Sequence, residues 1–185
     1  MSLRTAFMAG LLLVSAPAVA QQPGAPTSST APVAGQDQAI AYNDRLVGLQ
    51  DRVATKLLAM FATWEKGSAA AAGSLGDLQR ETASVLSDAK AVPAFNGDTS
   101  LRDSFIPLAQ YYSDAANNEF PQFVALLARA EQGQDVMAEW DVLQKSLESK
   151  EAVADARFAQ AQEAFAARWQ FALTPNELQQ QFETP

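Results

Sequence analysis

The chain has 185 residues, enough for one domain with a sizeable core, and its 13 basic and 21 acidic side chains give a formal charge of −8. This acidic balance favours solubility and opposes binding to nucleic acid phosphates and to anionic membrane surfaces. Cysteine and histidine are both absent, which excludes disulfides, a thiol nucleophile, a serine–histidine triad and the usual zinc, haem and Glu-x-x-His di-metal sites. Because no D-x-D-x-D-G loop is present either, we expect no metal and no cofactor.

Residues 1–20, "MSLRTAFMAGLLLVSAPAVA", have the three parts of a secretory signal peptide. Arg4 supplies the positive charge, residues 6–14 form an apolar run, and Ala18-Val19-Ala20 is an A-x-A cleavage site. The apolar run is too short for a stable membrane anchor. We therefore expect cleavage after Ala20 and an exported protein, periplasmic or secreted, with no stable membrane anchor.

Residues 21–36, "QQPGAPTSSTAPVAGQ", carry no charge and consist mostly of Pro, Gly, Ala, Ser, Thr and Gln. A segment of this composition cannot build a core, so we expect a disordered, flexible linker.

A helix is then predicted from about residue 37 to 66, followed by a linker over the alanines and glycines of residues 67–73. A second helix is predicted from about residue 74 to 92, ended by Pro93. In both helices a stripe that advances in steps of three and four positions is mostly apolar. Its apolar residues are Ile40, Val47, Ala54, Leu57, Phe61, Trp64, Leu75, Leu78, Val85, Ala89 and Val92.

The third and fourth helices are predicted at about residues 99–132 and 135–171. Asn96-Gly97 marks the turn before the third helix, and Pro107 and Pro121 predict a bend or a break within it. "LTPNELQQQF" predicts a short final helix, with Thr174 as its cap, Pro175 at its first position and Glu177 completing a capping box. The core stripes are Leu101, Phe105, Leu108, Ala115, Phe123 and Leu126, and then Trp140, Leu143, Leu147, Ala154, Phe158, Ala161, Phe165 and Trp169.

Four helices joined by short loops predict an all-α, up-down-up-down antiparallel four-helix bundle over residues 37–172. The signal peptide (residues 1–20) and the linker (residues 21–36) precede the bundle. The short capped helix and tail (residues 173–185) follow it.

Polar residues interrupt three of these core stripes. Burying an amide without a partner costs about 1–3 kcal/mol, and a lone buried carboxylate costs more. One interpretation is a hydrogen-bonded layer that fixes the helix register. The other is a small cavity for a polar ligand, lined by Asn43, Gln50, Tyr112 and Glu119, with Trp64 or Trp140 as walls. The candidate residues, for a structural polar layer or for ligand binding, are Tyr42, Asn43, Gln50, Tyr112, Glu119, Lys150 and Glu151. Beside them, we expect Asp44, Arg45, Asp51 and Arg52 to form an exposed charged face.

Several short motifs carry a family resemblance. "YND…V..Q" in the first helix, "FNGDTSLRDSF" before the third, "YY" followed by "NNEF", and "KE" with "Q..FA" in the fourth resemble an uncharacterised family of exported bacterial helical proteins, labelled only as surface proteins or lipoproteins. The resemblance implies no known activity. This chain lacks the cysteine of lipid-anchored members, which favours a free periplasmic or secreted protein. The recurring polar positions of the family would here be Tyr42, Asn43, Asp44, Gln50, Asp98, Tyr112, Glu119, Lys150, Glu151 and Gln162.

These observations favour a non-enzymatic protein of the bacterial envelope, with a structural role or a role in binding another envelope protein. No acid–base pair can be placed from the sequence, so no enzyme is predicted. One alternative is a small-ligand-binding bundle that uses the buried polar layer. Another is a periplasmic chaperone, because "LTPNELQQQF" is similar to the L-T-x-x-Q segments of Spy-type chaperones, although Glu177 stands where the glutamine belongs.

Overall fold

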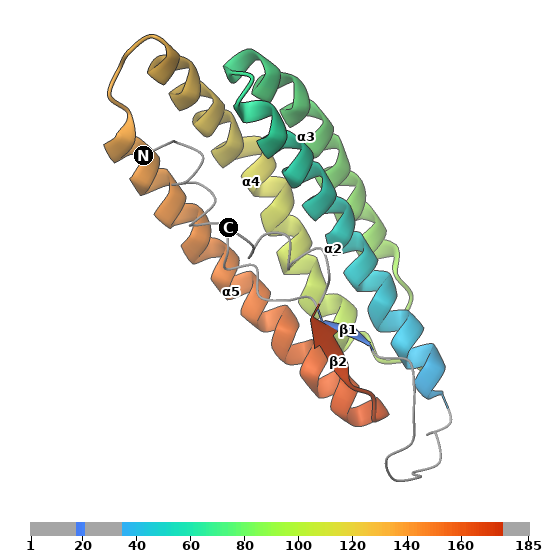
Figure 1. The fold of residues 1–185 in the computed structure, drawn as a ribbon. Helices are drawn as coiled ribbons and strands as arrows, with labels where there is room; N and C mark the ends of the chain where they lie inside the picture. The colour runs from blue at the N-terminus through green and yellow to red at the C-terminus, as the bar shows by residue number, and fades with distance from the viewer. Residues whose placement is uncertain (1–17, 21–34, 176–185) are drawn as a thin grey trace.

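The protein is a bundle of four long helices in which each helix runs antiparallel to the one before it (Figure 1). The computed structural model describes residues 18–20 and 35–175. Its helices are α2 (Gln36–Trp64), α3 (Ser68–Ala91), α4 (Ser100–Glu131) and α5 (Met137–Trp169). The prediction of an all-α four-helix bundle is thereby confirmed. Most of the predicted signal peptide and linker, residues 1–17 and 21–34, lies outside the described residues.

Two short strands join the beginning of the chain to the end of the bundle. Strand β1 (Ala18–Ala20) pairs antiparallel with strand β2 (Leu173–Pro175), with Val19 opposite Thr174. Thr174 and Pro175, predicted to cap and begin a short helix, are therefore in extended backbone. Proline fits here because it is the last residue of a short strand, where no further backbone donor is needed. The rest of that predicted helix, residues 176–185, lies outside the described residues.

Helix α3 begins earlier than its sequence predicts. We expected a linker over residues 67–73, but the helix starts at Ser68 and includes the four alanines at 69–72. Alanine is the strongest helix former. Glu131, at the end of α4, caps this helix because the Ser68 backbone N–H donates to its Oε1 and the Ser68 hydroxyl donates to its Oε2, both over 2.6 Å. Gly67 makes the turn at a φ of 100°, a conformation that favours glycine.

Helix α4 runs without a break from Ser100 to Glu131, through both Pro107 and Pro121. Of the predicted bend or break at the prolines, the break does not occur. Buried aromatic residues flank each proline, Phe105 before the first and Phe120 and Phe123 around the second. Packing on this apolar face holds the helix together across the missing backbone donors.

The core is built unevenly around α4. Helix α3 packs along both α2 and α4, whereas α5 packs mainly along α4 and approaches α2 closely at only a few positions. Aromatic side chains fill both ends of the interior. One end holds Phe61, Trp64, Phe120, Phe123 and Trp140, and the other holds Tyr42, Phe95, Phe165, Trp169 and Phe171. The polar residues singled out in the sequence lie mostly between these two aromatic clusters.

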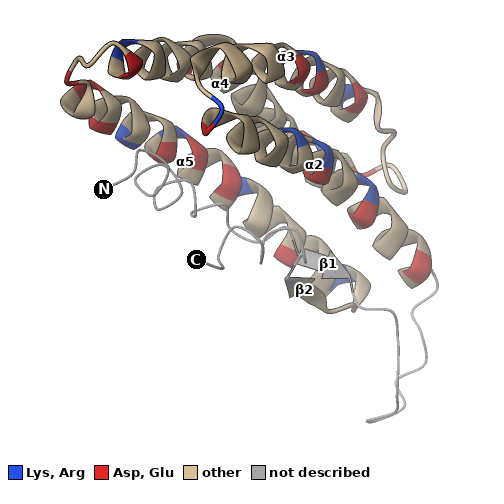
Figure 2. Ribbon diagram, turned by 45° about the horizontal axis from the view of Figure 1, so that its top comes forward, with Lys and Arg blue, Asp and Glu red and all other residues tan. Residues whose placement is uncertain are grey.

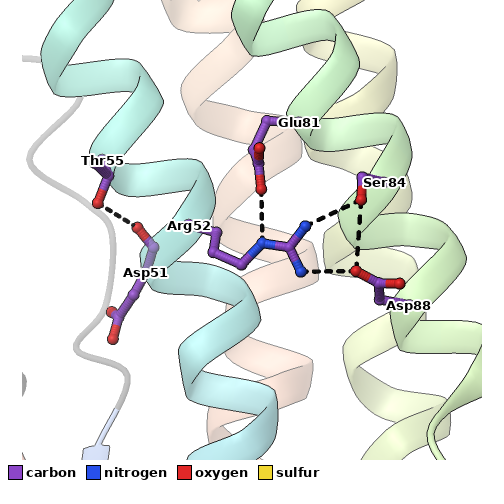
Figure 3. A network of polar contacts seen from close by, with 6 residues as sticks. All are labelled: Asp51, Arg52, Thr55, Glu81, Ser84 and Asp88. Carbon is purple, nitrogen blue, oxygen red and sulfur yellow. Dashed lines mark hydrogen bonds and ion pairs between the residues drawn. The ribbon is translucent and has the colours of Figure 1, made fainter.

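Charged residues occur along all four helices (Figure 2). We expected Arg52 of α2 to be exposed, but its side chain reaches across to α3 (Figure 3). Its guanidinium donates to Glu81 over 2.6 Å, to Asp88 over 2.7 Å and to the Ser84 hydroxyl over 3.0 Å. These bonds raise the pKa of Arg52, with Asp88 contributing most. The network ties α2 to α3 on the side of the bundle away from α5.

The cap between α4 and α3 gives a first prediction. Replacing Glu131 with alanine removes both acceptors for Ser68, so the first turn of α3 should fray and the melting temperature should fall. The bonds from Ser68 lower the pKa of Glu131, so this stabilisation is present above the carboxyl group's ordinary pKa and is lost as the pH falls below it. Hydrogen exchange at the amides of residues 69–72 measures the fraying. Glu163→Ala, at an exposed position of α5, should leave those amides unchanged; equal exchange in both variants would contradict the capping role.

Candidate functional site

A layer of buried polar side chains crosses the middle of the bundle. The helical period places these residues on the core stripes of α2, α4 and α5, so each helix buries its polar groups together with its apolar neighbours. The layer was predicted in part, and the structure adds Asp155 and Gln162 to it. Its members are Asn43, Gln50, Tyr112, Glu119, Glu151, Asp155 and Gln162, each at most 7% exposed.

Two hydrogen bonds in this layer join different helices. Gln162 of α5 donates from Nε2 to Asn43 Oδ1 of α2 over 2.9 Å. Gln50 of α2 donates from Nε2 to the Tyr112 hydroxyl of α4 over 3.1 Å. The amide oxygen of Gln50 is buried and receives no hydrogen bond from the described residues. Both bonds fix the height of one helix against another.

Tyr42 and the tryptophans lie apart from this layer. The Tyr42 hydroxyl donates to the carbonyl oxygen of Pro93 over 3.0 Å, and its ring packs against Phe95 at the end of the bundle. Burial raises the pKa of Tyr42. Trp64 and Trp140 pack edge to face at 5.5 Å in the aromatic cluster at the opposite end. These residues therefore do not surround a common site with Asn43 and Gln50.

Glu151 is a buried carboxyl group on α5, 4% exposed, and Asp155 follows one helical turn later at 3%. No hydrogen bond from a described residue reaches the Glu151 carboxyl group. Burial, followed by the charges of Asp155 and Glu148, raises the pKa of Glu151 to about 8. Burial, followed by the charges of Glu151 and Asp155, also holds the pKa of Tyr112 well above its usual range. Glu151 therefore keeps its proton in the folded protein at neutral pH.

Lys150 and Glu119 form an ion pair on the outer side of α4 and α5. Lys150 Nζ donates to Glu119 Oε1 over 2.5 Å. The lysine side chain is 57% exposed, whereas that of Glu119 is 9% exposed. Consecutive residues of α5 thus point in different directions, since Lys150 lies at the surface and Glu151 lies in the core.

The ion pair lies in a surface groove between α4 and α5, which we call the α4–α5 groove. Two cavities of about 570 and about 720 Å³ make up this groove, and Glu119 and Lys150 line both of them. Val142 lines the first cavity and Val153 the second, and these two valines are 71% and 74% exposed. The other lining residues are Gln122, Ala138, Glu139, Leu143 and Ser146 in the first cavity, and Pro107, Gln110, Tyr111, Asp114, Ala115, Asn118 and Ser149 in the second.

The polar layer and the groove differ in what they can do. Asn43, Gln50 and Tyr112 line neither cavity of the groove. Gln50 bonds to Tyr112, and Asn43 bonds to Gln162 and to the neighbouring Asp44. In the part of the chain that the structure describes, no three acidic side chains are placed to hold a metal ion. Within the same residues, no helix is long and apolar enough to cross a membrane. The groove is the part of the site that an outside molecule can reach.

Comparison with known proteins does not assign this chain to a family. No family model, no curated protein and no solved structure matches the chain. The resemblance to exported bacterial surface proteins stays a prediction, and function must be inferred from the side chains described above.

The hydrogen bond between α2 and α5 gives a second prediction. Asn43→Leu leaves the buried Gln162 amide without its partner, so the free energy of unfolding should fall by about 1–3 kcal/mol. The double variant Asn43→Leu with Gln162→Leu should recover most of this loss, because both polar groups are then gone. Urea denaturation of the single and double variants measures the coupling. Combining Asn43→Leu with Gln160→Leu, at an exposed position of α5, should give simple additivity; additivity in both pairs would contradict the bond's role.

The buried carboxyl group gives a third prediction. Unfolded, Glu151 ionises near 4.5, but in the folded protein it holds its proton up to about 8. Between these values the unfolded state binds fewer protons, so the free energy of unfolding should fall as the pH rises. Glu151→Gln removes the ionisable group and should be more stable than the wild type at pH 8 by on the order of 2–4 kcal/mol, with little difference at pH 4. Glu163→Gln, the exposed control, should follow the wild type; parallel pH curves for Glu151→Gln would refute a protonated core carboxyl.

Proposed function

We propose that this protein is an exported, non-enzymatic helical bundle of the bacterial envelope that binds another protein through the α4–α5 groove. The observation that carries the proposal is the groove itself, a concave surface with an exposed valine in each of its two cavities. Single exposed apolar residues are common on proteins, but apolar side chains grouped in a concave surface are typical of binding sites.

Export is supported by the sequence of residues 1–20, with its positive charge, apolar run and A-x-A site. The absence of cysteine from the whole chain favours a free protein of the periplasm or the medium over a lipid-anchored one. Cleavage after Ala20 would remove strand β1. That strand pairs with β2 and also lies close to α2, so cleavage would remove these contacts from the bundle.

A binding role is favoured over catalysis by the state of the ionisable groups. In the groove, Glu119 is paired with Lys150 and Glu139 with Arg129. Groups held in ion pairs stay charged and position a partner, whereas acid–base catalysis uses a group that gains and loses a proton near the working pH. The group with such a pKa, Glu151, is in the core. In the interior, the amides of the polar layer bond to other helices, which favours a structural role for that layer.

A photo-crosslinking experiment tests this proposal. The full chain is produced in its native host with benzoylphenylalanine at Val142, at Val153 or at Ser87, an exposed position of α3. We expect the recovered protein to begin at Gln21 by mass spectrometry, and to cross-link to the same envelope protein from both groove positions but not from Ser87. A cytoplasmic product that keeps residues 1–20 would refute export. Equal cross-linking from all three positions, or none from the groove, would refute binding through α4 and α5.

A further inference from the structure

We propose that the α4–α5 groove takes an α-helical segment with a lysine or arginine between two apolar side chains, and that this cation replaces Lys150 at Glu119. The inference depends on the proposed function, since it assumes that the groove binds a protein. It adds the chemistry of the bound segment and the residue that recognises it.

The ion pair lies where the two halves of the groove meet. Glu119 and Lys150 are the two residues that line both cavities. Lys150 reaches from α5 to the carboxylate of α4 and so crosses between a half that contains Val142 and a half that contains Val153. A segment lying along the whole groove must therefore pass over this bond or displace the lysine.

The two members of the pair are not equally fixed. The Glu119 carboxylate is nearly buried, and Lys150 is the cation that neutralises it. A buried carboxylate that loses its cation without replacement is strongly destabilising. Lys150, however, is more than half exposed and makes no other hydrogen bond or ion pair with the described residues, so its ammonium group can return to water at little cost. Exchange of one cation for another keeps Glu119 neutralised throughout.

The charges around the groove favour a basic segment. The ionisable side chains that line it, apart from tyrosine, are three acidic residues, Asp114, Glu119 and Glu139, and one basic residue, Lys150. Arg129 neutralises Glu139 through two bonds of 2.6 and 2.7 Å. The carboxylate of Asp114 receives a hydrogen bond from the Gln110 amide over 2.8 Å but forms no ion pair within residues 35–175. A segment with acidic side chains would be repelled by these like charges. A second copy of this chain, which carries a formal charge of −8, would be repelled in the same way.

The apolar contacts set the length of the segment. Val142 and Val153 are eleven residues apart on α5, which corresponds to about 16 Å and three turns along one helix face. A partner helix lying along α4 and α5 would place apolar side chains over the two valines and its cation midway, over Glu119. The apolar area of two exposed valines is far smaller than the roughly 800 Å² that each partner buries in a stable dimer interface. A short segment therefore fits the groove better than a second folded subunit.

Phage display with random 16-residue peptides tests the inference. The library is selected on the full chain and counter-selected on Val142→Gln with Val153→Gln, which keeps the charge and removes the apolar contacts. We expect the enriched peptides to share a lysine or arginine flanked by apolar residues. Their affinity should fall about tenfold or more in Glu119→Gln, and should rise in Lys150→Gln, where the competing cation is gone. Circular dichroism of each variant confirms that it is folded. If Lys150→Gln, which leaves the Glu119 carboxylate without its cation, is not folded, the comparison of Glu119→Gln with the wild type decides the matter.

The matched control is Asp114→Asn, which removes the same charge from the same groove without touching the ion pair. A loss below about threefold is expected there. Equal losses in Asp114→Asn and Glu119→Gln, or groove-dependent peptides without a basic residue, would overturn the exchange at Glu119 and leave the proposed function standing. Enrichment only of peptides that bind equally well to the counter-selected variant, or no enrichment, would overturn both.

Discussion

The architecture depends on one constraint, that polar groups carried into the core on three helices must meet partners on other helices. α5 is the helix most affected, because it packs mainly along α4 and has few close approaches to α2. The bond between Gln162 and Asn43 is one of the links between α2 and α5. Because α2 and α5 are antiparallel, a step of seven residues forward along α2 from Asn43 corresponds to a step of seven residues backward along α5 from Gln162. Gln50 of α2 therefore lies at the height of Asp155 of α5. The bond between Gln50 and Tyr112 then sets the height of α4. One register thus accounts for both interhelical hydrogen bonds of the layer, and an apolar core would allow neighbouring registers to compete.

The same register explains why α5 has two different faces at adjacent residues. Steps of three and four along its core stripe pass through Leu147, Glu151, Asp155 and Phe158, all buried. Lys150 is one residue before this stripe and projects toward α4 at the surface, where it meets Glu119. The core face therefore carries protonated or hydrogen-bonded groups that hold the bundle together. The outer face carries an ion pair and exposed valines that remain available to another molecule.

The sequence was sufficient for what depends on local pattern and insufficient for what depends on distant contacts. Periodicity located all four helices, and most residues of the predicted stripes of α2, α3 and α4 are buried. The buried face of α2 is wider than its predicted stripe and also includes Leu46, Val53 and Met60. In α5 the predicted stripe passed through Ala154 and Ala161, which are partly exposed, because alanine looks more apolar than its neighbours Asp155 and Gln162. The start of α3 was misplaced because its cap comes from Glu131, 63 residues away in the chain. Strand β2 depends on pairing with residues at the other end of the described chain. The α4–α5 groove has no sequence pattern of its own, since it arises from how two helices separate.

The difference between interior and surface pairs is the reason why we propose a binding site on the outside of this bundle. Breaking the bond between Asn43 and Gln162 leaves two amides in a space that water does not reach, so a ligand there would have to replace both partners and also open the core. Breaking the bond between Lys150 and Glu119 returns the lysine to water at once, and an incoming cation restores the neutralisation of Glu119. The first exchange is opposed by the whole packing of the bundle, whereas the second is opposed only by the binding of a flexible side chain. The proposed recognition of a partner at the surface ion pair therefore leaves the interior polar groups free to set the register of the helices.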